Sequence, residues 1–211
     1  MKTASISYTK PQLDVEYDFV AVIDGLPPVD RAAFDLSREI TSMLEGEGIS
    51  CRVLDSASLA SARGALDRLE QDSKAGKRFA LHFVGHGNAN GVGVGPEFMD
   101  WKELGSRLVP VNTAMSGALI VNMTSCRGVH GIKSTQLSSS GDPFFGIVGA
   151  AQVLSVADAH KINRSFYAKW FSGTPINTIV HEINTEFGYD ILFCASSEGY
   201  RSLNDTGGGH E

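Results

Sequence analysis

Phe79-Ala-Leu-His-Phe-Val-Gly-His-Gly87 reads as a buried strand that stops abruptly at a histidine held between two glycines. Its apolar residues form a short run of the kind that is buried on both faces of a parallel sheet. The two glycines let the backbone turn sharply and come close to a ligand. Open α/β sheets bind ligands where their strands end, so an imidazole at this place is well positioned for chemistry. The alternative is a polar turn that happens to contain a histidine.

The pattern on both sides of this stretch predicts an α/β fold. Besides residues 79–84, apolar runs predict strands over residues 17–23, 49–54, 117–123, 144–150 and 189–195. Helical spacing predicts helices over residues 31–45, from Ser56 or Ser58 to Gly76, and over 101–108, 158–171 and 175–187, with Asp30 as a cap for the first. This order predicts a three-layer sandwich, in which helices cover both faces of a mostly parallel six-stranded sheet.

A single domain is expected over residues 16–195. Residues 1–15 are predicted to be a flexible N-terminus or an edge strand, and residues 196–211 a disordered tail. Residues 90–95 are rich in glycine and favour a small hairpin. Residues 129–143 are predicted to form a long polar loop, and a loop of that length in a compact domain is usually functional or disordered.

Charge and cysteine content narrow the class of protein. The 211 residues carry a net charge of −6, with a pI of about 5.5 and no basic cluster, which argues against nucleic-acid binding. No apolar run is long enough to span a membrane, and the first residues lack the apolar core of a signal peptide. Three cysteines, an odd number, fit a reducing compartment, so a cytoplasmic protein is expected. We expect neither a metal nor another cofactor, because no His or Cys pair has the spacing of metal ligands.

Cys126 follows a predicted strand, as His86 does, and lies 40 positions after it. If the two strands lie side by side, both residues emerge at the same edge of the sheet. A cysteine nucleophile needs a base or an imidazolium partner, because the thiolate is the reactive form. The turn around Cys126 also offers backbone amides that can point at an anion. Taken alone, Cys126 equally fits a small buried residue, which is the usual position of a free cysteine.

Together the two motifs resemble those of the caspase-like cysteine peptidases, the group of caspases, metacaspases, paracaspases and bacterial CHAT proteases. Phe83-Val-Gly-His-Gly87 is similar to the histidine motif. Thr124-Ser-Cys-Arg-Gly128 keeps the last three positions of the caspase Q-A-C-[RQG]-G signature, whose histidine lies about 50 residues upstream. The runs Phe145–Gly149, Phe166-Tyr167 and Gly173–Pro175 resemble the second half of CHAT domains. The resemblance covers about residues 16–195.

The resemblance implies a cysteine endopeptidase with a Cys-His dyad that acts on a protein or peptide substrate. Cys126 would be the nucleophile, and His86 the general acid and base that protonates the leaving amine. The amides of Gly87 and Cys126 would form the oxyanion hole, which stabilises the charge that develops on the scissile carbonyl. No third catalytic residue is assigned, because the family needs none.

The resemblance also places the pocket for the residue before the cut at three positions of the chain. These are the end of the first strand, the position two before the cysteine, and the segment after the fifth strand. Asp24, Thr124 and Asp158 (or Ser155) stand there, where caspases have Arg and Gln at the first two. Because a buried carboxylate is stabilised by a cationic partner, Asp24 and Asp158 suggest Arg or Lys before the scissile bond. Asp24 equally fits a loop or cap residue, and Asp158 better fits a helix N-cap.

Regulation is expected as well. Residues 129–143 match in position the segment that caspases cleave or reorder on activation, and Lys133 is a compatible self-cleavage site; a plain connector fits equally. Arg127 is expected to be structural. The small size suggests control by an activating protein or a small-molecule ligand. For a bacterial protein, the resemblance implies immunity, such as antiviral defence, or programmed cell death.

Two other functions stay open. A catalytically silent caspase-like scaffold that binds a protein partner would have the same sequence if His86 and Cys126 were misaligned, although the presence of both argues against it. A nucleotide or phosphate binder that uses residues 85–95 is the weaker alternative, because the third glycine and the P-loop lysine are missing.

Overall fold

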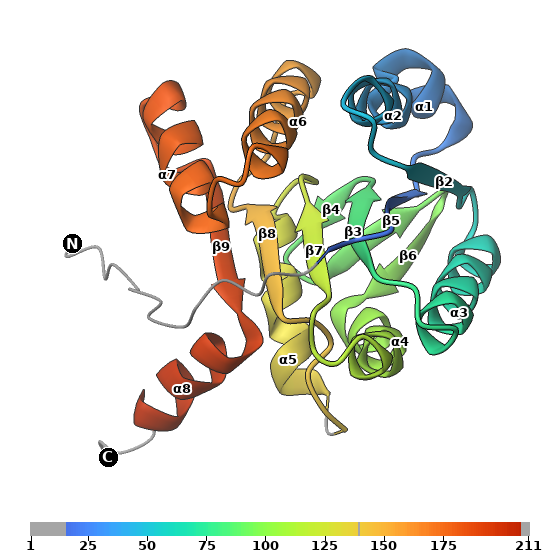
Figure 1. The fold of residues 1–211 in the computed structure, drawn as a ribbon, viewed down its shortest axis with the longest axis vertical. Coiled ribbons are helices and arrows are strands. Elements are labelled where there is room, and N and C mark those ends of the chain that lie inside the picture. The colour runs from blue at the N-terminus through green and yellow to red at the C-terminus, as the bar shows by residue number, and fades with distance from the viewer. Residues whose placement is uncertain (1–15, 139, 208–211) are drawn as a thin grey trace.

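A computed structural model describes residues 16–138 and 140–207, which form an α/β domain with a main sheet and a small sheet (Figure 1). The strands of the main sheet are β1 (Phe19–Asp24), β2 (Cys51–Asp55), β3 (Phe79–Val84), β7 (Ile120–Met123), β8 (Gly146–Ala150) and β9 (Leu192–Ser196). The helices are α1 (Pro28–Phe34), α2 (Leu36–Gly46), α3 (Leu59–Lys74), α4 (Trp101–Ala114), the short 3-10 helix η1 (Gly128–Lys133), α5 (Ser134–Leu137), α6 (Val156–Phe171), α7 (Ile176–Phe187) and α8 (Ser197–Gly207). The prediction for residues 1–15 lies outside the described residues.

The main sheet is mostly parallel and six-stranded, as predicted. Its strands run in the order β2-β1-β3-β7-β8-β9, and neighbouring strands are parallel except for β8 and β9. β1, β3 and β8 are buried at every position. A strand that is covered on both faces favours apolar residues throughout, which explains their mainly apolar sequences; Asp24 on β1 and His82 on β3 are the buried exceptions.

Two apolar cores lie on the two faces of this sheet. Along β1, Phe19, Ala21 and Ile23 join one core, and Val20 and Val22 join the other, because successive side chains of a strand point to opposite faces. The first core contains residues of α3 and α4, and the second contains residues of α2, α6 and α7. Figure 1 shows these two groups of helices on opposite sides of the sheet, which gives three layers.

The small sheet is antiparallel and is formed by β4 (Gly87–Asn88), β5 (Gly91–Val94) and β6 (Glu97–Asp100). It includes the hairpin predicted from the glycine-rich run, and it rests on the carboxyl end of the main sheet. The Gly95 amide donates to the Gly25 carbonyl at 2.8 Å. A Cβ on Gly25 or Gly85 would stand only 2.8 or 2.9 Å from the Gly93 carbonyl oxygen. Glycine at these positions therefore lets the two sheets pack backbone against backbone.

Residues 129–137 differ from their prediction as part of a long polar loop, because they lie in η1 and α5. The sequence is polar, yet Gly131, Ile132, Ser134 and Thr135 are all buried. A Cβ on Gly131 would stand 2.7 Å from Ile147 Cδ1, so the chain packs directly onto β8 at this point. The prediction of a long free loop is therefore wrong for these residues, and among the described residues of the predicted loop only 138 and 140–143 lie outside helix and strand.

The predicted disordered tail is also wrong over residues 197–207, which form α8. The Ser197 hydroxyl donates to the Phe144 carbonyl at 2.7 Å, and Tyr200 packs against the first core. These contacts hold α8 against the domain, although the polar composition of residues 197–207 does not predict a packed helix. The last four residues of the chain lie outside the described residues.

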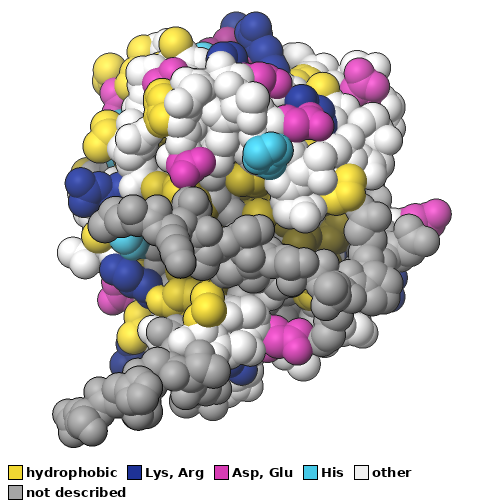
Figure 2. Space-filling model, turned by 90° about the vertical axis from the view of Figure 1, so that its left-hand side faces the viewer, with side chains coloured by type: hydrophobic (Ala, Val, Ile, Leu, Met, Phe, Trp, Pro, Cys, Tyr) yellow, Lys and Arg dark blue, Asp and Glu magenta, His cyan; other side chains and the backbone are white. Residues whose placement is uncertain are grey.

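β9 forms an outer edge of the main sheet. Figure 2 views the molecule from this side and shows hydrophobic side chains at several places on it. Tyr189 and Phe193 are 49% and 41% exposed at this end.

In the part of the chain that the structure describes, no helix is long and apolar enough to cross a membrane.

Candidate active site

His86 and Cys126 lie at matching positions beyond two neighbouring strands. β3 and β7 are parallel, and His82 pairs with Asn122 across them. His86 and Cys126 each follow this pair by four residues. Since parallel strands end at the same edge of a sheet, the register brings both residues to the carboxyl edge. The side-by-side placement of the two strands, on which the sequence interpretation depended, is confirmed.

Gly87 brings the two segments into backbone contact. A Cβ on Gly87 would stand 2.3 Å from the Cys126 carbonyl oxygen, so only glycine fits beside the cysteine turn. The Gly93 amide donates to the His86 carbonyl at 2.8 Å. Hydrogen-bonded and non-hydrogen-bonded pairs alternate along an antiparallel ladder, so the next pair, Gly87 with Val92, is a non-hydrogen-bonded pair. The Gly87 amide consequently points out of the ladder.

The His86 ring is bonded to an acid that sequence reasoning did not assign. Its Nε2 lies 2.7 Å from Asp30 Oδ2, and the Phe34 ring meets it edge-on, with 6.3 Å between the ring centroids. Both partners lie on α1, whose N-cap is Pro27, so the prediction that Asp30 caps this helix is wrong. Because a carboxylate oxygen only accepts hydrogen bonds, Nε2 is the donor here, and Nδ1 is the ring nitrogen left for another partner.

Nothing in the sequence around Asp30 announces this role. An acid in the first turn of a helix is common, because it complements the helix dipole. Asp30 and His86 are 56 residues apart, and only the packing of α1 beside the end of β3 brings them together. The sequence shows only that Asp30 follows the first strand, and this does not indicate where its side chain points.

The half-buried Cys126 lies in a turn that is tied to the segment between β8 and α6. The Leu154 amide donates to Cys126 Sγ at 3.4 Å, and the Arg127 amide donates to the Gln152 carbonyl at 3.0 Å. Arg127 has a left-handed backbone with φ of 55°, which turns the chain from the cysteine into η1. An N–H directed at the sulfur is complementary to a thiolate.

His86 and Cys126 do not share a hydrogen bond within the described residues. The sulfur contacts the Leu154 amide and, at 3.8 Å, the Leu154 carbonyl, whereas the imidazole contacts Asp30. The His86 side chain is 55% exposed and has room to turn. Catalytic hydrogen bonds are often long or absent in substrate-free enzymes and form in the complex with substrate.

Asp24 stands at the end of β1 with its carboxylate directed into the protein. It is 2% exposed and accepts hydrogen bonds from the Ser37 hydroxyl at 2.7 Å and from the Leu26 amide at 3.1 Å. Arg31 Nε lies 3.2 Å from the same carboxylate, and the guanidinium also binds Asp55 at 2.6 Å. In this structure Asp24 therefore stabilises the turn between β1 and α1 as one member of a cluster with Arg31 and Asp55.

Thr124 and Asp158, the other two predicted pocket residues, also make internal hydrogen bonds. Thr124 is buried, and its hydroxyl contacts His82 and Asn163. Ser155 is the N-cap of α6 and Asp158 its capping-box partner, whose carboxylate accepts the Ser155 hydroxyl at 2.7 Å. The structure thus brings none of the three side chains into contact with His86 or Cys126 by a hydrogen bond or ion pair.

Lys133 lies in the last turn of η1 rather than on a loop. Its ammonium donates to the Ala89 carbonyl at 3.1 Å, and the following residues Ser134 and Thr135 are 2% and 1% exposed. A protease needs an accessible, extended segment. Self-cleavage after Lys133 would therefore require η1 and α5 to unfold locally.

The geometry weighs against nucleotide or phosphate binding at residues 85–95. Open α/β sheets bind nucleotides in the crevice where the strand order reverses, here between the carboxyl ends of β1 and β3. The small sheet packs on that place, through Gly93 against Gly25 and Gly85. The nearby N-terminus of α3 is occupied as well, because Glu97 Oε2 accepts the Leu59 amide at 2.8 Å.

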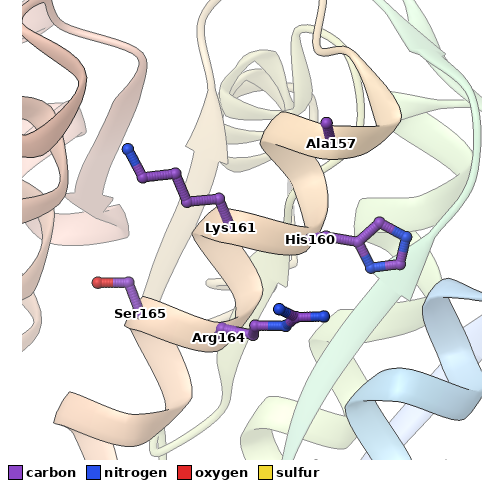
Figure 3. A pocket seen from close by; sticks show the side chains of 5 residues that line it. All are labelled: Ala157, His160, Lys161, Arg164 and Ser165. Atoms are coloured by element: carbon purple, nitrogen blue, oxygen red, sulfur yellow. The ribbon is translucent and has the colours of Figure 1, made fainter.

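A hollow of about 550 Å³ on the outer surface of α6 contains basic side chains but does not form a convergent site (Figure 3). Figure 3 shows Lys161 and Ser165 on one side of the helix and His160 and Arg164 on the other. His160 and Arg164 both bind Glu39, and Lys161 lies over the Phe187 ring at 4.2 Å.

Across residues 16–138 and 140–207, no group of three His, Cys, Asp or Glu side chains is placed to hold a metal ion.

Comparison of the sequence with protein-family models and with curated proteins gives no match.

Proposed function

We propose that this protein is a caspase-like cysteine endopeptidase in which Cys126 is the nucleophile and His86 the general acid and base. One observation carries the proposal. His86 and Cys126 stand at equal distances along the chain beyond paired positions of adjacent parallel strands, and the Gly87 backbone abuts the cysteine turn. The close backbone approach at Gly87 would let its amide and that of Cys126 act together as an oxyanion hole.

The reaction would proceed by covalent catalysis. His86 takes the Cys126 thiol proton, and the sulfur adds to the scissile carbonyl carbon, which forms a C–S bond and places a negative charge on the carbonyl oxygen. The amides of Gly87 and Cys126 stabilise that charge. The C–N bond then breaks, His86 gives its proton to the leaving amine, and water hydrolyses the thioester. Asp30 would hold the His86 ring during these proton transfers.

A basic residue before the cut is the specificity that the charges at this edge support. Arg31 is bound to both Asp24 and Asp55, so its charge is already matched. Asp30, which is bonded to His86, is a third carboxylate at this edge of the sheet. The resulting surplus of negative charge attracts Arg or Lys and disfavours Asp, although Asp24 itself is directed inward. The exposed Arg127, next to the nucleophile, is the cation that an acidic substrate would contact instead.

The experiment is hydrolysis of fluorogenic peptides that differ only in the residue before the reporter, with Arg, Lys, Asp or Leu there. Cleavage after Arg or Lys that is absent in Cys126→Ala and kept in Cys194→Ala would support the proposal in full. Cleavage after Asp would keep the mechanism and overturn the basic preference. Hydrolysis that persists in Cys126→Ala would exclude Cys126 as the nucleophile.

A silent scaffold that binds a protein partner is the second candidate, because His86 is bonded to Asp30 and not to Cys126. The same observation fits a resting enzyme that a substrate, an activating protein or a small ligand completes. Site-resolved alkylation with iodoacetamide separates the two. A Cys126 that reacts faster than free cysteine, and slower after His86→Ala, indicates an enzyme, whereas a rate unaffected by His86→Ala indicates a scaffold. A role in bacterial immunity or cell death would follow only from the enzyme.

A further inference from the structure

A buried chain of hydrogen bonds runs beneath the Cys126 turn. His82, on β3, is fully buried, and its Nδ1 lies 2.7 Å from the Tyr167 hydroxyl. Its Nε2 lies 3.0 Å from Thr124 Oγ1, and the Thr124 hydroxyl donates to Asn163 Oδ1 at 2.9 Å. The chain thus links β3, the turn after β7, and α6, which supplies both Asn163 and Tyr167.

The direction of each hydrogen bond is fixed by the next one. An amide oxygen only accepts, so the Thr124 proton goes to Asn163 and the Thr124 oxygen must accept from His82. His82 then carries its proton on Nε2, which leaves Nδ1 to accept from the Tyr167 hydroxyl. A neutral ring satisfies all of these bonds. Burial lowers the pKa of His82 to about 3 and raises that of Tyr167, so neither group is charged near neutral pH.

This buried chain reaches the candidate nucleophile from two directions. Thr124 lies two residues before Cys126 in the same turn. Asn163 and Tyr167 hold α6, and α6 begins directly after the segment in which the Leu154 amide donates to Cys126 Sγ at 3.4 Å. A shift of α6 relative to β3 would therefore separate the sulfur from its amide donor.

We propose that His82, Tyr167, Thr124 and Asn163 act as one positioning unit that keeps the Cys126 turn in register with Leu154 and Gly87. None of the four would touch the substrate, and the inference rests on the proposed peptidase function. It gives Thr124 a role different from a pocket residue, since its hydroxyl lies inside the protein. Loss of the unit is expected to lower kcat far more than it changes KM, because the substrate pocket itself stays intact.

The test compares three variants of the full-length protein. Thr124→Val keeps the shape but removes both hydrogen bonds, Tyr167→Phe removes one, and Thr124→Ser restores the hydroxyl. Displacement of a reacting group by about 1 Å can cost on the order of a hundredfold in rate. Site-resolved alkylation of Cys126 by iodoacetamide is expected to slow by about tenfold in the first two variants, and to stay within about twofold of the native rate in Thr124→Ser. Thr113→Val, on the exposed surface of α4, is the control.

Rates are compared only at a temperature where circular dichroism shows each variant to be folded, so that lost stability is not mistaken for lost positioning. If Thr124→Val does not fold, Tyr167→Phe decides. Equal Cys126 rates in the native protein and in these variants would overturn the positioning unit while leaving the peptidase proposal intact. A native Cys126 that reacts no faster than free cysteine would instead remove the peptidase proposal.

Discussion

The His86 imidazole is held by Asp30, whose Oδ2 lies 2.7 Å from Nε2. The acid fixes one ring nitrogen as a donor and orients the ring at the carboxyl edge of the sheet. Such an arrangement stabilises the imidazolium that forms when a histidine accepts a proton. Asp30 is therefore a positioning residue for His86 in the proposed mechanism.

Replacing Asp30 with Asn is expected to lower kcat by roughly ten- to a hundredfold, with KM changed by less than about twofold, because the amide no longer stabilises the charged ring. Steady-state kinetics on the best fluorogenic peptide measure both constants. Asp35→Asn is the matched control, since Asp35 pairs with Arg38 on the surface. An unchanged kcat in Asp30→Asn would show that His86 works without this partner.

Gly87→Ala is expected to abolish peptide hydrolysis and to destabilise the protein by about 1–3 kcal/mol, because the new methyl group would overlap the Cys126 carbonyl, 2.3 Å away. Gly64→Ala, in the middle of α3, has no atom within 4 Å of the new Cβ and should raise stability by roughly 0.5–1 kcal/mol. Urea unfolding of both variants gives the comparison. A fully active Gly87→Ala would contradict the packing described here.

The buried His82 predicts a specific dependence of stability on pH. Its pKa is about 3 in the folded protein, against 6.5 for an unperturbed histidine, so above pH 6.5 the ring is neutral in both the folded and the unfolded chain. Between pH 6.5 and pH 3, His82 binds a proton in the unfolded chain but not in the folded chain. The free energy of unfolding therefore falls by about 1.4 kcal/mol per pH unit as the pH is lowered. From pH 7 to pH 5 the native protein should lose about 2 kcal/mol more than His82→Gln. Equal losses in urea titrations would show that His82 is not buried as described.

The thiols should differ strongly in reactivity. Burial raises the pKa of Cys194 to about 11 and also raises that of Cys51. At pH 7.5 only about one Cys194 in 3,000 is then a thiolate, so alkylation near neutral pH should be confined to Cys126. Mass spectrometry after brief treatment with iodoacetamide reads out each site. Modification of Cys194 before Cys126 would contradict this order.

The sequence predicts the layers of the fold better than the contacts of the site. Mainly apolar runs such as residues 79–84 identify buried parallel strands, and the helical spacing of residues 158–171 and 175–187 closely matches α6 and α7. The error at residues 129–137 has a physical cause. Glycine and serine there suggest a loop, yet glycine is needed because Gly131 packs directly against Ile147.

The positions of the predicted site residues follow from the strand order, but the directions of their side chains do not. Asp24 stands at the end of β1 as expected, and its inward direction depends on Arg31 and Ser37. Thr124 is directed inward by His82, whose partner Tyr167 lies 85 residues away. Partners this distant in the chain leave no local pattern in the sequence, so the acid beside His86 could not be identified either.

The reversed direction of β9 has a practical consequence for handling this protein. Ser196, at the end of β9, pairs with Gly146 at the start of β8. The chain therefore leaves the sheet at the edge formed by the amino ends of the parallel strands. Phe19, where β1 begins, lies at that same edge, whereas His86 and Cys126 follow the opposite ends of their strands. The described chain thus enters the sheet at Phe19 and leaves it at Ser196 on the side opposite the proposed chemistry, and a partner fused or tethered on that side should leave His86 and Cys126 open to dissolved peptides.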